Sequence, residues 1–400
     1  EHIDFILHQP DFLRLEAAWR GIHYLVTHIQ LSEELKLRIF PASRAEITQD
    51  LEYTKQVLLQ KCDKEEYQQF GGEPYGLIVI DYAFSQLPRD VALLACLAEV
   101  GSQCACPVIG GVSANLLNCD DFSGLARKRR LDRLFDLPDY LEWRTFRKQP
   151  EASHIGLALP RVLGRNLHLE AGDRPERFAY EETIDALEAW PWINAAFPLA
   201  ERIAQTYLIH GWLATVADPE SGGRMADLPT RDFITDTGEF AFCCTTEMPF
   251  DQQLAAQLNG MGLIVLKHQE GRDEAVFNAL PSLYDKSSER RPRSDTSDDL
   301  VMIMLLSQII RVLRCYIRDR IGFLGSEEEM LMSLNDWLRG YVVEEDGAPA
   351  PNTPFAEARL EHDWNWNESG KRSRIWVRPE FQVESSPLLS RELLLPSPEA

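Results

Sequence analysis

Basic residues are scarce in this sequence. Lys and Arg number 41 against 63 Asp and Glu, so the 400-residue chain carries a formal net charge of -22 at pH 7. A surface of this charge repels phosphate backbones and anionic lipid headgroups. We therefore expect no nucleic-acid partner, and cationic protein surfaces are better candidates.

Long uninterrupted apolar runs are also missing. The longest candidate, "LVMIMLLSQIIRVLRCYI" at 300–317, is broken by Ser307, Gln308, Arg311 and Arg314. A membrane-spanning helix needs about 20 predominantly apolar residues, so this segment predicts a core helix and no membrane insertion. The opening "EHID" lacks the basic start and cleavage site of a secretory signal peptide. We expect a cytoplasmic protein.

Motifs that hold phosphates or metals are absent as well. The sequence has no G-x-G-x-x-G or G-x4-G-K-[ST] loop for a nucleotide and no H-E-x-x-H pair. Its eight cysteines include the adjacent Cys243 and Cys244 and the close pair Cys104 and Cys106, but no C-x2-C pairs. This spacing suits neither a secreted disulfide framework nor a four-ligand zinc site. We expect reduced thiols, no cofactor and no metal.

The pattern that is present indicates an α/β fold. Apolar runs at 74–85 ("PYGLIVIDYAFS") and 106–114 ("CPVIGGVSA") are typical of strands buried on both faces, and the segment 90–105 between them predicts a crossover helix. Alternating residues in "LKLRIFPAS", 35–43, predict a half-buried strand, and 152–164 predict another. We expect mixed sheets flanked by helices, in more than one subdomain.

Composition and helical spacing divide the chain into four parts. We expect an N-terminal helix over 1–34 and an α/β core domain over 35–165. A second domain with loops is predicted over 166–297. Helices followed by a C-terminal strand are predicted over 298–400, with that strand returning to the core and extending to a neighbouring molecule.

Two residues allow an enzymatic interpretation. Asp81 is predicted at the carboxyl end of a strand, where α/β enzymes often carry catalytic groups, although a capping or turn role is the commoner one. Ser113 follows the next strand as a nucleophile would, but Asn115 stands where a nucleophile elbow needs glycine. An enzyme using either residue stays the less favoured alternative.

The stretch "FLRLEAAWRGIHYLV", 12–26, has apolar residues three and four apart, which is typical of a helix. We predict that Trp19 packs this helix onto the core and that Arg20 points outward to a carboxylate. Gly21 would let another element approach closely, at a helix-propensity cost of about 1 kcal/mol.

Short motifs in a fixed order make the whole chain recognisable. After "FLRLEAAWRGIHYLV" come "LKLRIF", "GGEPYGLIVIDYAF", "LEWRTFRKQPEASHIGLALPRVLGR", "WPWINAAF", "GGRMADLP", "RCYIRDRIG" and "WVRPEFQ". This series resembles the large subunit of the type VI secretion contractile sheath, a phage tail sheath-like architecture. The family-motif residues that carry the resemblance include Trp19, Arg20, Gly21, Asp81, Tyr82, Trp143, Arg144, Pro160 and Arg161.

The resemblance implies a structural role. Members of this family pair with a small sheath subunit, and the pairs polymerise around inner-tube hexamers on a baseplate. Contraction of the sheath then ejects the tube. The resemblance implies that a disassembly AAA+ ATPase recognises the family's N-terminal region, and we expect that binding segment to be missing from the residues given. A sheath-like paralogue that does not contract and serves as a baseplate or cap scaffold is the alternative.

Terminal strands in the family are donated to neighbouring subunits, which is β-augmentation. "RIWVRPEFQV" alternates and contains Pro379, which suits an edge strand or bulge. The resemblance and this pattern together predict an inter-subunit strand that includes Ile375, Trp376, Val377, Arg378, Phe381 and Val383. An ordinary edge strand that closes the chain's own sheet is the alternative. A candidate basic interface is formed by Arg127, Lys128, Arg129 and Arg130, or else these residues are a solvated basic face.

Overall fold

The fold was analysed in a computed structural model. It describes residues 2–67, 69–127, 131, 133–167, 182, 184, 187–213, 216, 223–234, 240–285, 299–320, 327–343, 353, 355–363, 372–379 and 389–394. The helices and strands reported below lie within these ranges.

A six-stranded mixed sheet forms the centre of the molecule, in the order β1-β2-β3-β9-β10-β6. The first four strands are parallel to one another, and β10 and β6 add antiparallel at the far edge. The strands are β1 (Ile78–Phe84), β2 (Val108–Val112), β3 (Ile155–Leu159), β9 (Ile264–His268), β10 (Ala275–Phe277) and β6 (Arg224–Met225). The α/β prediction is confirmed.

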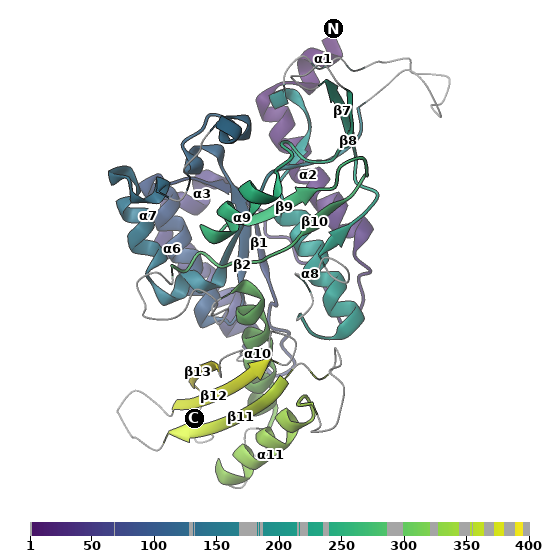
Figure 1. Cartoon of the computed structure of the whole chain (residues 1–400). Helices are drawn as coiled ribbons and strands as arrows, with labels where there is room; N and C mark the ends of the chain where they lie inside the picture. The colour runs from purple at the N-terminus through teal and green to yellow at the C-terminus, as the bar shows by residue number, and fades with distance from the viewer. Residues whose placement is uncertain are drawn as a thin grey trace.

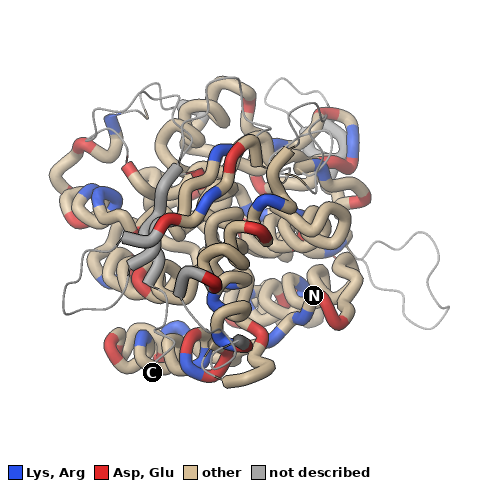
Figure 2. Tube along the Cα trace, turned by 90° about the horizontal axis from the view of Figure 1, so that it is seen from below, with Lys and Arg blue, Asp and Glu red and all other residues tan. Residues whose placement is uncertain are grey.

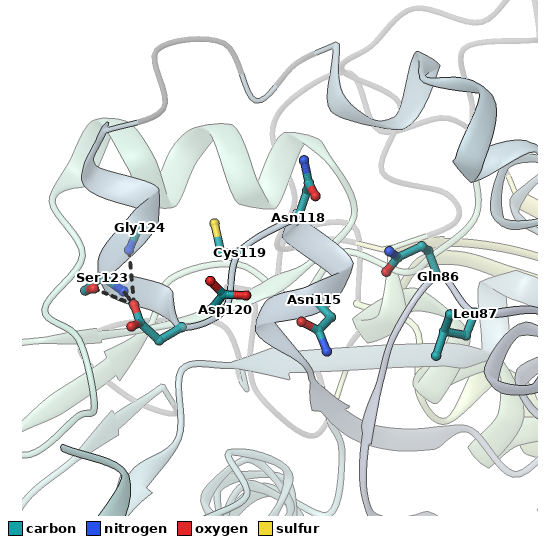
Figure 3. Close-up of a pocket in the computed structure, with 9 residues that line it drawn as sticks. Gln86, Leu87, Asn115, Asn118, Cys119, Asp120, Ser123 and Gly124 are labelled. Carbon is teal, nitrogen blue, oxygen red and sulfur yellow. Dashed lines mark hydrogen bonds between the residues drawn. The ribbon is translucent and has the colours of Figure 1, made fainter. Parts of the chain in front are cut away.

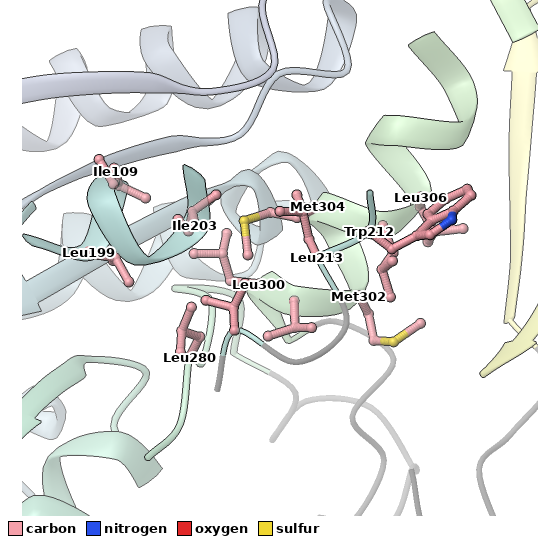
Figure 4. Packing of buried hydrophobic residues seen from close by; sticks show 14 of the residues in the cluster. Ile109, Leu199, Ile203, Trp212, Leu213, Leu280, Leu300, Met302, Met304 and Leu306 are labelled. Carbon is pink, nitrogen blue, oxygen red and sulfur yellow. The ribbon is translucent and has the colours of Figure 1, made fainter. Parts of the chain in front are cut away.

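Helices cover both faces of this sheet, which explains the apolar runs. Because side chains alternate along a strand, Ile109 and Ala158 face one core and their neighbours Val108 and Leu157 face the other. The second core lies against α6 (Pro88–Gln103), α7 (Leu141–Arg147) and α9 (Gln252–Gly260). The first lies against α2 (Pro10–His28), α8 (Ala196–His210) and α10 (Leu300–Arg320). Figure 4 shows α8 and α10 side chains meeting in it.

Helix α10 is the segment that the sequence marked as its longest apolar run. Leu300–Asp319 is long and apolar enough to cross a membrane, yet 67% of its most apolar window is buried inside the fold. Leu300, Met304 and Leu305 are among its fully buried side chains. The prediction of a core helix is confirmed.

The chain before β1 departs from the prediction. Residues 35–43 form no strand; Leu35 and Leu37 still pack against the core, and Lys36 still points outward, toward Glu73. The predicted strand is therefore wrong, and its in-and-out alternation holds only as far as Leu37, because Ile39 is 58% exposed. The helical elements here are α1 (His2–Leu7), α3 (Arg44–Gln49), α4 (Leu51–Leu59), the π-helical turn η1 (Gln60–Lys64) and α5 (Glu65–Tyr67).

Short elements fill the connections. The segment between β2 and β3 holds the 3-10 turns η2 (Ala114–Leu117), η3 (Phe122–Arg127), η4 (Leu134–Asp136), η5 (Pro138–Tyr140) and η6 (Pro150–His154) beside α7. Two small ladders pair β4 (Val162–Leu163) with β5 (Trp192–Ile193) and β7 (Arg231–Ile234) with β8 (Phe240–Cys244). The 3-10 turn η7 (Leu187–Ala189) precedes β5.

A separate antiparallel sheet, β11-β12-β13, lies beyond α10 with α11 (Glu327–Arg339) against it. Its strands are β11 (Phe355–Asp363), β12 (Arg372–Pro379) and β13 (Leu389–Leu394). Figure 1 shows this sheet at one end of the molecule and α1 with the start of α2 at the other. Strands from 224–277 complete the central sheet that β1–β3 begin. The predicted four-part division stays a prediction.

Candidate assembly surface

The inward face of α2 packs against α8. Gly21 and Leu25 are buried there, and the Phe197 ring lies so close to Gly21 that a methyl group at that position would overlap it. Gly21 thus permits an approach that any other residue would obstruct, and this offsets its low helix propensity.

The outward face of α2 is apolar as well. Trp19 is 64% exposed, Leu15 57% and Val26 49%. The prediction that Trp19 packs onto the core is therefore wrong, because Gly21 and Leu25 form the face that does. We call Phe12, Leu15, Trp19 and Val26 the α2 seam; Ile22, at the margin of this stripe, is half-buried and packs against the first core.

Charged contacts hold α2 in this orientation. Arg20 Nε donates to Glu16 Oε1 one turn away at 3.3 Å, so Arg20 does meet a carboxylate. Glu16 also accepts from the buried Arg165, whose Nε lies 2.7 Å from Glu16 Oε1. The same guanidinium donates to Glu182 Oε2 at 2.7 Å. A buried pair with several charge-assisted bonds fixes geometry firmly, so α2 has little freedom to turn its seam inward.

Tyr82 and Asp81 lie within β1 and have structural partners. The Tyr82 hydroxyl donates to Asp90 Oδ1 at 2.7 Å, and Arg44 stacks on the Tyr82 ring and donates to the same oxygen at 3.0 Å. Burial, together with the hydrogen bond to Asp90, raises the pKa of Tyr82 to about 12. Asp81 accepts from Asn194 Nδ2 at 3.4 Å. Asp81 is in the middle of the strand, and not at the carboxyl end where the sequence placed it.

The geometry does not assemble a catalytic pair from Asp81 and Ser113. Ser113 Oγ accepts from the Asn115 backbone N–H at 3.4 Å and caps η2. A hollow of about 640 Å³ lies near the carboxyl ends of β1 and β2, but neither Asp81 nor Ser113 lines it. Figure 3 shows its polar lining. Asp121 Oδ1 accepts from the backbone N–H groups of Ser123 and Gly124 in its own turn. Its lining residues are Gln86, Leu87, Asn115, Asn118, Cys119, Asp120, Asp121, Ser123 and Gly124.

The remaining family-motif residues also hold the fold together. Trp143 is fully buried beside aromatic neighbours. Arg144 Nη1 donates to the Asp136 carbonyl at 2.9 Å. Pro160 follows β3 through a cis peptide bond. Arg161 donates twice to Glu247, at 2.8 and 2.7 Å, a bidentate pair that fixes the chain after β3.

Comparison with known proteins identifies the family to which these structural residues belong. Residues 1–284 match the model of the tail sheath N-terminal domain of the EvpB/VC_A0108 family, and residues 290–392 match that family's tail sheath gpW/gp25-like domain. This chain belongs to the type VI secretion tail sheath family. It is 32% identical over 402 residues to the type VI secretion system sheath protein TssC1 of Pseudomonas aeruginosa. That match covers 96% of this chain and 80% of TssC1.

In the gpW/gp25-like domain, β12 is the central strand of its sheet. It pairs with β11 on one side and with β13 on the other. The expectation of an edge strand here is wrong, because both hydrogen-bonding edges of Ile375, Trp376 and Val377 face strands of the same chain. Ile375 and Val377 are fully buried, and Arg378 Nη2 donates to Glu357 on β11 at 3.0 Å.

The other residues of the predicted inter-subunit strand, Phe381 and Val383, lie outside the described residues. The inter-subunit role of this segment therefore stays a prediction. Of the predicted basic interface, Arg127 ends η3, and Lys128, Arg129 and Arg130 lie outside the described residues. In Figure 2, basic and acidic positions are interspersed along the described trace.

One arrangement that the sequence analysis missed joins the two sheath domains. Arg311, Arg314 and Arg318 are three and four residues apart on α10, so they share a face. Arg311 donates to the Ala105 carbonyl at 2.6 Å and Arg314 to the Gln103 carbonyl at 2.9 Å, both at the end of α6. Arg318 donates to the Glu66 carbonyl at 2.8 Å. The spacing of the three arginines can be read from the sequence. Their acceptors cannot, because a backbone carbonyl does not depend on the residue type.

Proposed function

We propose that this chain is a structural subunit of the type VI secretion contractile sheath. It pairs with the small sheath subunit, polymerises around the inner tube and drives the ejection of that tube by contraction. The observation that carries the proposal is the order and extent of the match: both tail sheath domains follow each other across nearly the whole chain. The name of the relative TssC1, a sheath protein, supports the same role.

The proposed partners follow from this role. They are the small sheath subunit, further copies of this chain in a helical polymer, inner-tube hexamers and the baseplate. The proposed location is the bacterial cytoplasm, where the net charge of -22 keeps a concentrated protein soluble until specific contacts form.

Two features of the fold support assembly as the role. The α2 seam presents apolar side chains outward, and the outer edge of β13 has no partner strand among the described residues. Exposed apolar faces and open strand edges are surfaces on which proteins associate. The non-enzymatic role is supported by Asp81 and Ser113, whose described partners are structural ones.

Electron microscopy of the chain co-expressed with its small sheath subunit tests the proposal. Negative-stain images should contain long tubes of uniform diameter. Discrete particles of fixed size would instead favour the non-contractile baseplate or cap scaffold, and no association at all would refute the sheath role.

A further inference from the structure

Three cysteines meet where the turn η1 packs against the end of α6. Cys62 lies within the π-helical turn η1, and Cys104 and Cys106 lie just after the last helical residue of α6. Together with Val100 they form a small buried cluster, separate from the two cores of the central sheet. All three are free thiols. Buried thiols pack like any small apolar group, so what distinguishes this cluster is that it places oxidisable sulfurs on two different elements.

The end of α6 fixes the position of Cys104. Ala105 has a left-handed φ of 49° and closes the helix with a Schellman turn. In this turn the Cys106 N–H donates to the Gly101 carbonyl at 2.9 Å. The Ala105 N–H donates to the Ser102 carbonyl at 3.4 Å. Cys104 is the capping residue of α6, so this turn sets the direction of its side chain.

The neighbourhood of Cys62 is tied to the same place. The hydroxyl of Tyr67, in α5 just after η1, donates to the Cys104 carbonyl at 2.9 Å. Arg314 of α10 bridges the two elements. It donates to the carbonyl that precedes Cys104 at 2.9 Å, and its Nη1 lies 3.7 Å from Oδ1 of Asp63, the residue after Cys62. These contacts hold the backbones that carry the two sulfurs against each other.

The thiols of Cys62 and Cys104 differ in reactivity. Cys62 is 6% exposed and Cys104 is 1% exposed, so a small oxidant reaches Cys62 first. A hydrogen bond from the Cys104 thiol lowers the pKa of Cys62, against burial and the nearby carboxylates of Glu66 and Asp63, which raise it. The same hydrogen bond, together with burial, raises the pKa of Cys104. Because the thiolate is the reactive form of cysteine, Cys62 is the nucleophile of the pair.

We propose that Cys62 and Cys104 form an oxidation site that a hydroperoxide converts into a reversible disulfide. The Cys62 thiolate attacks one oxygen of hydrogen peroxide and the O–O bond breaks. Hydroxide leaves and recombines with the proton that Cys62 gave up, so that Cys62 becomes a sulfenic acid and one water is formed. The Cys104 thiol then attacks this sulfur, the S–O bond breaks, and a second water leaves with the thiol proton. The two thiols are oxidised by two electrons, and the peroxide is reduced to water.

The disulfide would lie beneath the junction of the two sheath domains. Arg311 and Arg314 of α10 donate to the carbonyls on either side of Cys104, at 2.6 and 2.9 Å. A bond from Cys104 to Cys62 therefore adds a covalent link to the surface on which the gpW/gp25-like domain rests. Disulfides in cytosolic proteins are usually transient and redox-sensing, and this one would respond to peroxide. The inference goes beyond the proposed function and does not depend on it.

Peptide mass spectrometry of the purified chain tests the site. The wild type is treated with hydrogen peroxide, its remaining thiols are alkylated, and it is digested without reductant. We expect a pair of peptides joined through Cys62 and Cys104, lighter by two hydrogen atoms than the reduced peptides, and lost after dithiothreitol. Cys96→Ser is the matched control, because Cys96 is also buried on α6 but its sulfur donates to the Leu51 carbonyl at 3.5 Å. This variant should form the link as the wild type does.

Two further variants test the order of the steps. In Cys104→Ser the sulfenic acid has no thiol to resolve it, so dimedone should label Cys62. In Cys62→Ser the Cys104 thiol should stay reduced at the same peroxide dose.

Three results would overturn the inference. They are a disulfide from Cys62 to Cys106 in place of Cys104, dimedone labelling of Cys104 in Cys62→Ser, and an unoxidised Cys62 in the wild type at a peroxide dose that oxidises free glutathione. The last of these is measured on the unaltered chain, so it decides the question even if a serine variant fails to fold.

Discussion

Truncating one leucine on each face of α2 should give very different losses of stability. Leu25 is 3% exposed and belongs to the first core. Its replacement by alanine removes buried methyl groups and leaves a cavity, which costs about 2–5 kcal/mol. Leu15 is 57% exposed. Because full burial of a leucine is worth about 1.5–3 kcal/mol, less than half of that, about 1 kcal/mol, is at stake in Leu15→Ala.

Urea unfolding of the purified chain, followed by circular dichroism, measures both losses. Leu25→Ala should move the midpoint to clearly lower urea at an unchanged slope, whereas Leu15→Ala should stay close to wild type. The two substitutions are chemically identical, so the helix propensities of the residues cancel. Equal losses of stability, or a larger loss for Leu15→Ala, would show that α2 faces the core with its other side. The claim that the α2 seam is exposed would then be wrong.

Three further predictions test individual residues of the fold. Gly21→Val should cost about 1–3 kcal/mol by overpacking against Phe197, and Phe197→Leu should restore part of that loss in thermal unfolding; no rescue would mean that the two do not touch. Asp90→Asn should cost about 1.5–3 kcal/mol in urea unfolding, because the charge that accepts from Tyr82 and Arg44 is lost; an unchanged midpoint would contradict this. Burial lowers the pKa of His268, so the folded chain favours the neutral ring and stability should fall as the pH drops below about 6.5. His268→Gln should reduce that fall between pH 7 and pH 5, and an identical pH profile would argue against it.

The sequence predicted the first two strands of the central sheet well, although only β2 is buried on both faces and β1, at the sheet edge, is mostly half-buried with Asp81 exposed. The apolar runs of β1 and β2 and the helix between them appear in the structure within a few residues of their predicted positions. A strand that its own chain covers on both faces has apolar side chains at nearly every position, so it can be recognised in the sequence. Residues 35–43 differ, because Leu35 and Leu37 face the core without a partner strand for the backbone.

Orientation was harder to predict than periodicity. The helix over 12–26 was recognised, but α2 is apolar on two sides, and spacing alone does not say which side meets the core. Gly21 marks the side of α2 that meets the core, since only a glycine lets the Phe197 ring come so close. Likewise, β12 is central because β13 follows it in the same chain, and an alternating pattern with a terminal Pro379 does not reveal a third strand.

Sedimentation of the co-expressed pair tests the central claim most directly, namely that this chain works by building a polymer with a second subunit. Clarified lysate containing this chain and the small sheath subunit is centrifuged at high speed, and the pellet is compared with that from either protein alone. The sheath role predicts that both proteins pellet together in a constant ratio. Recovery of both chains in the supernatant as separate monomers would contradict it.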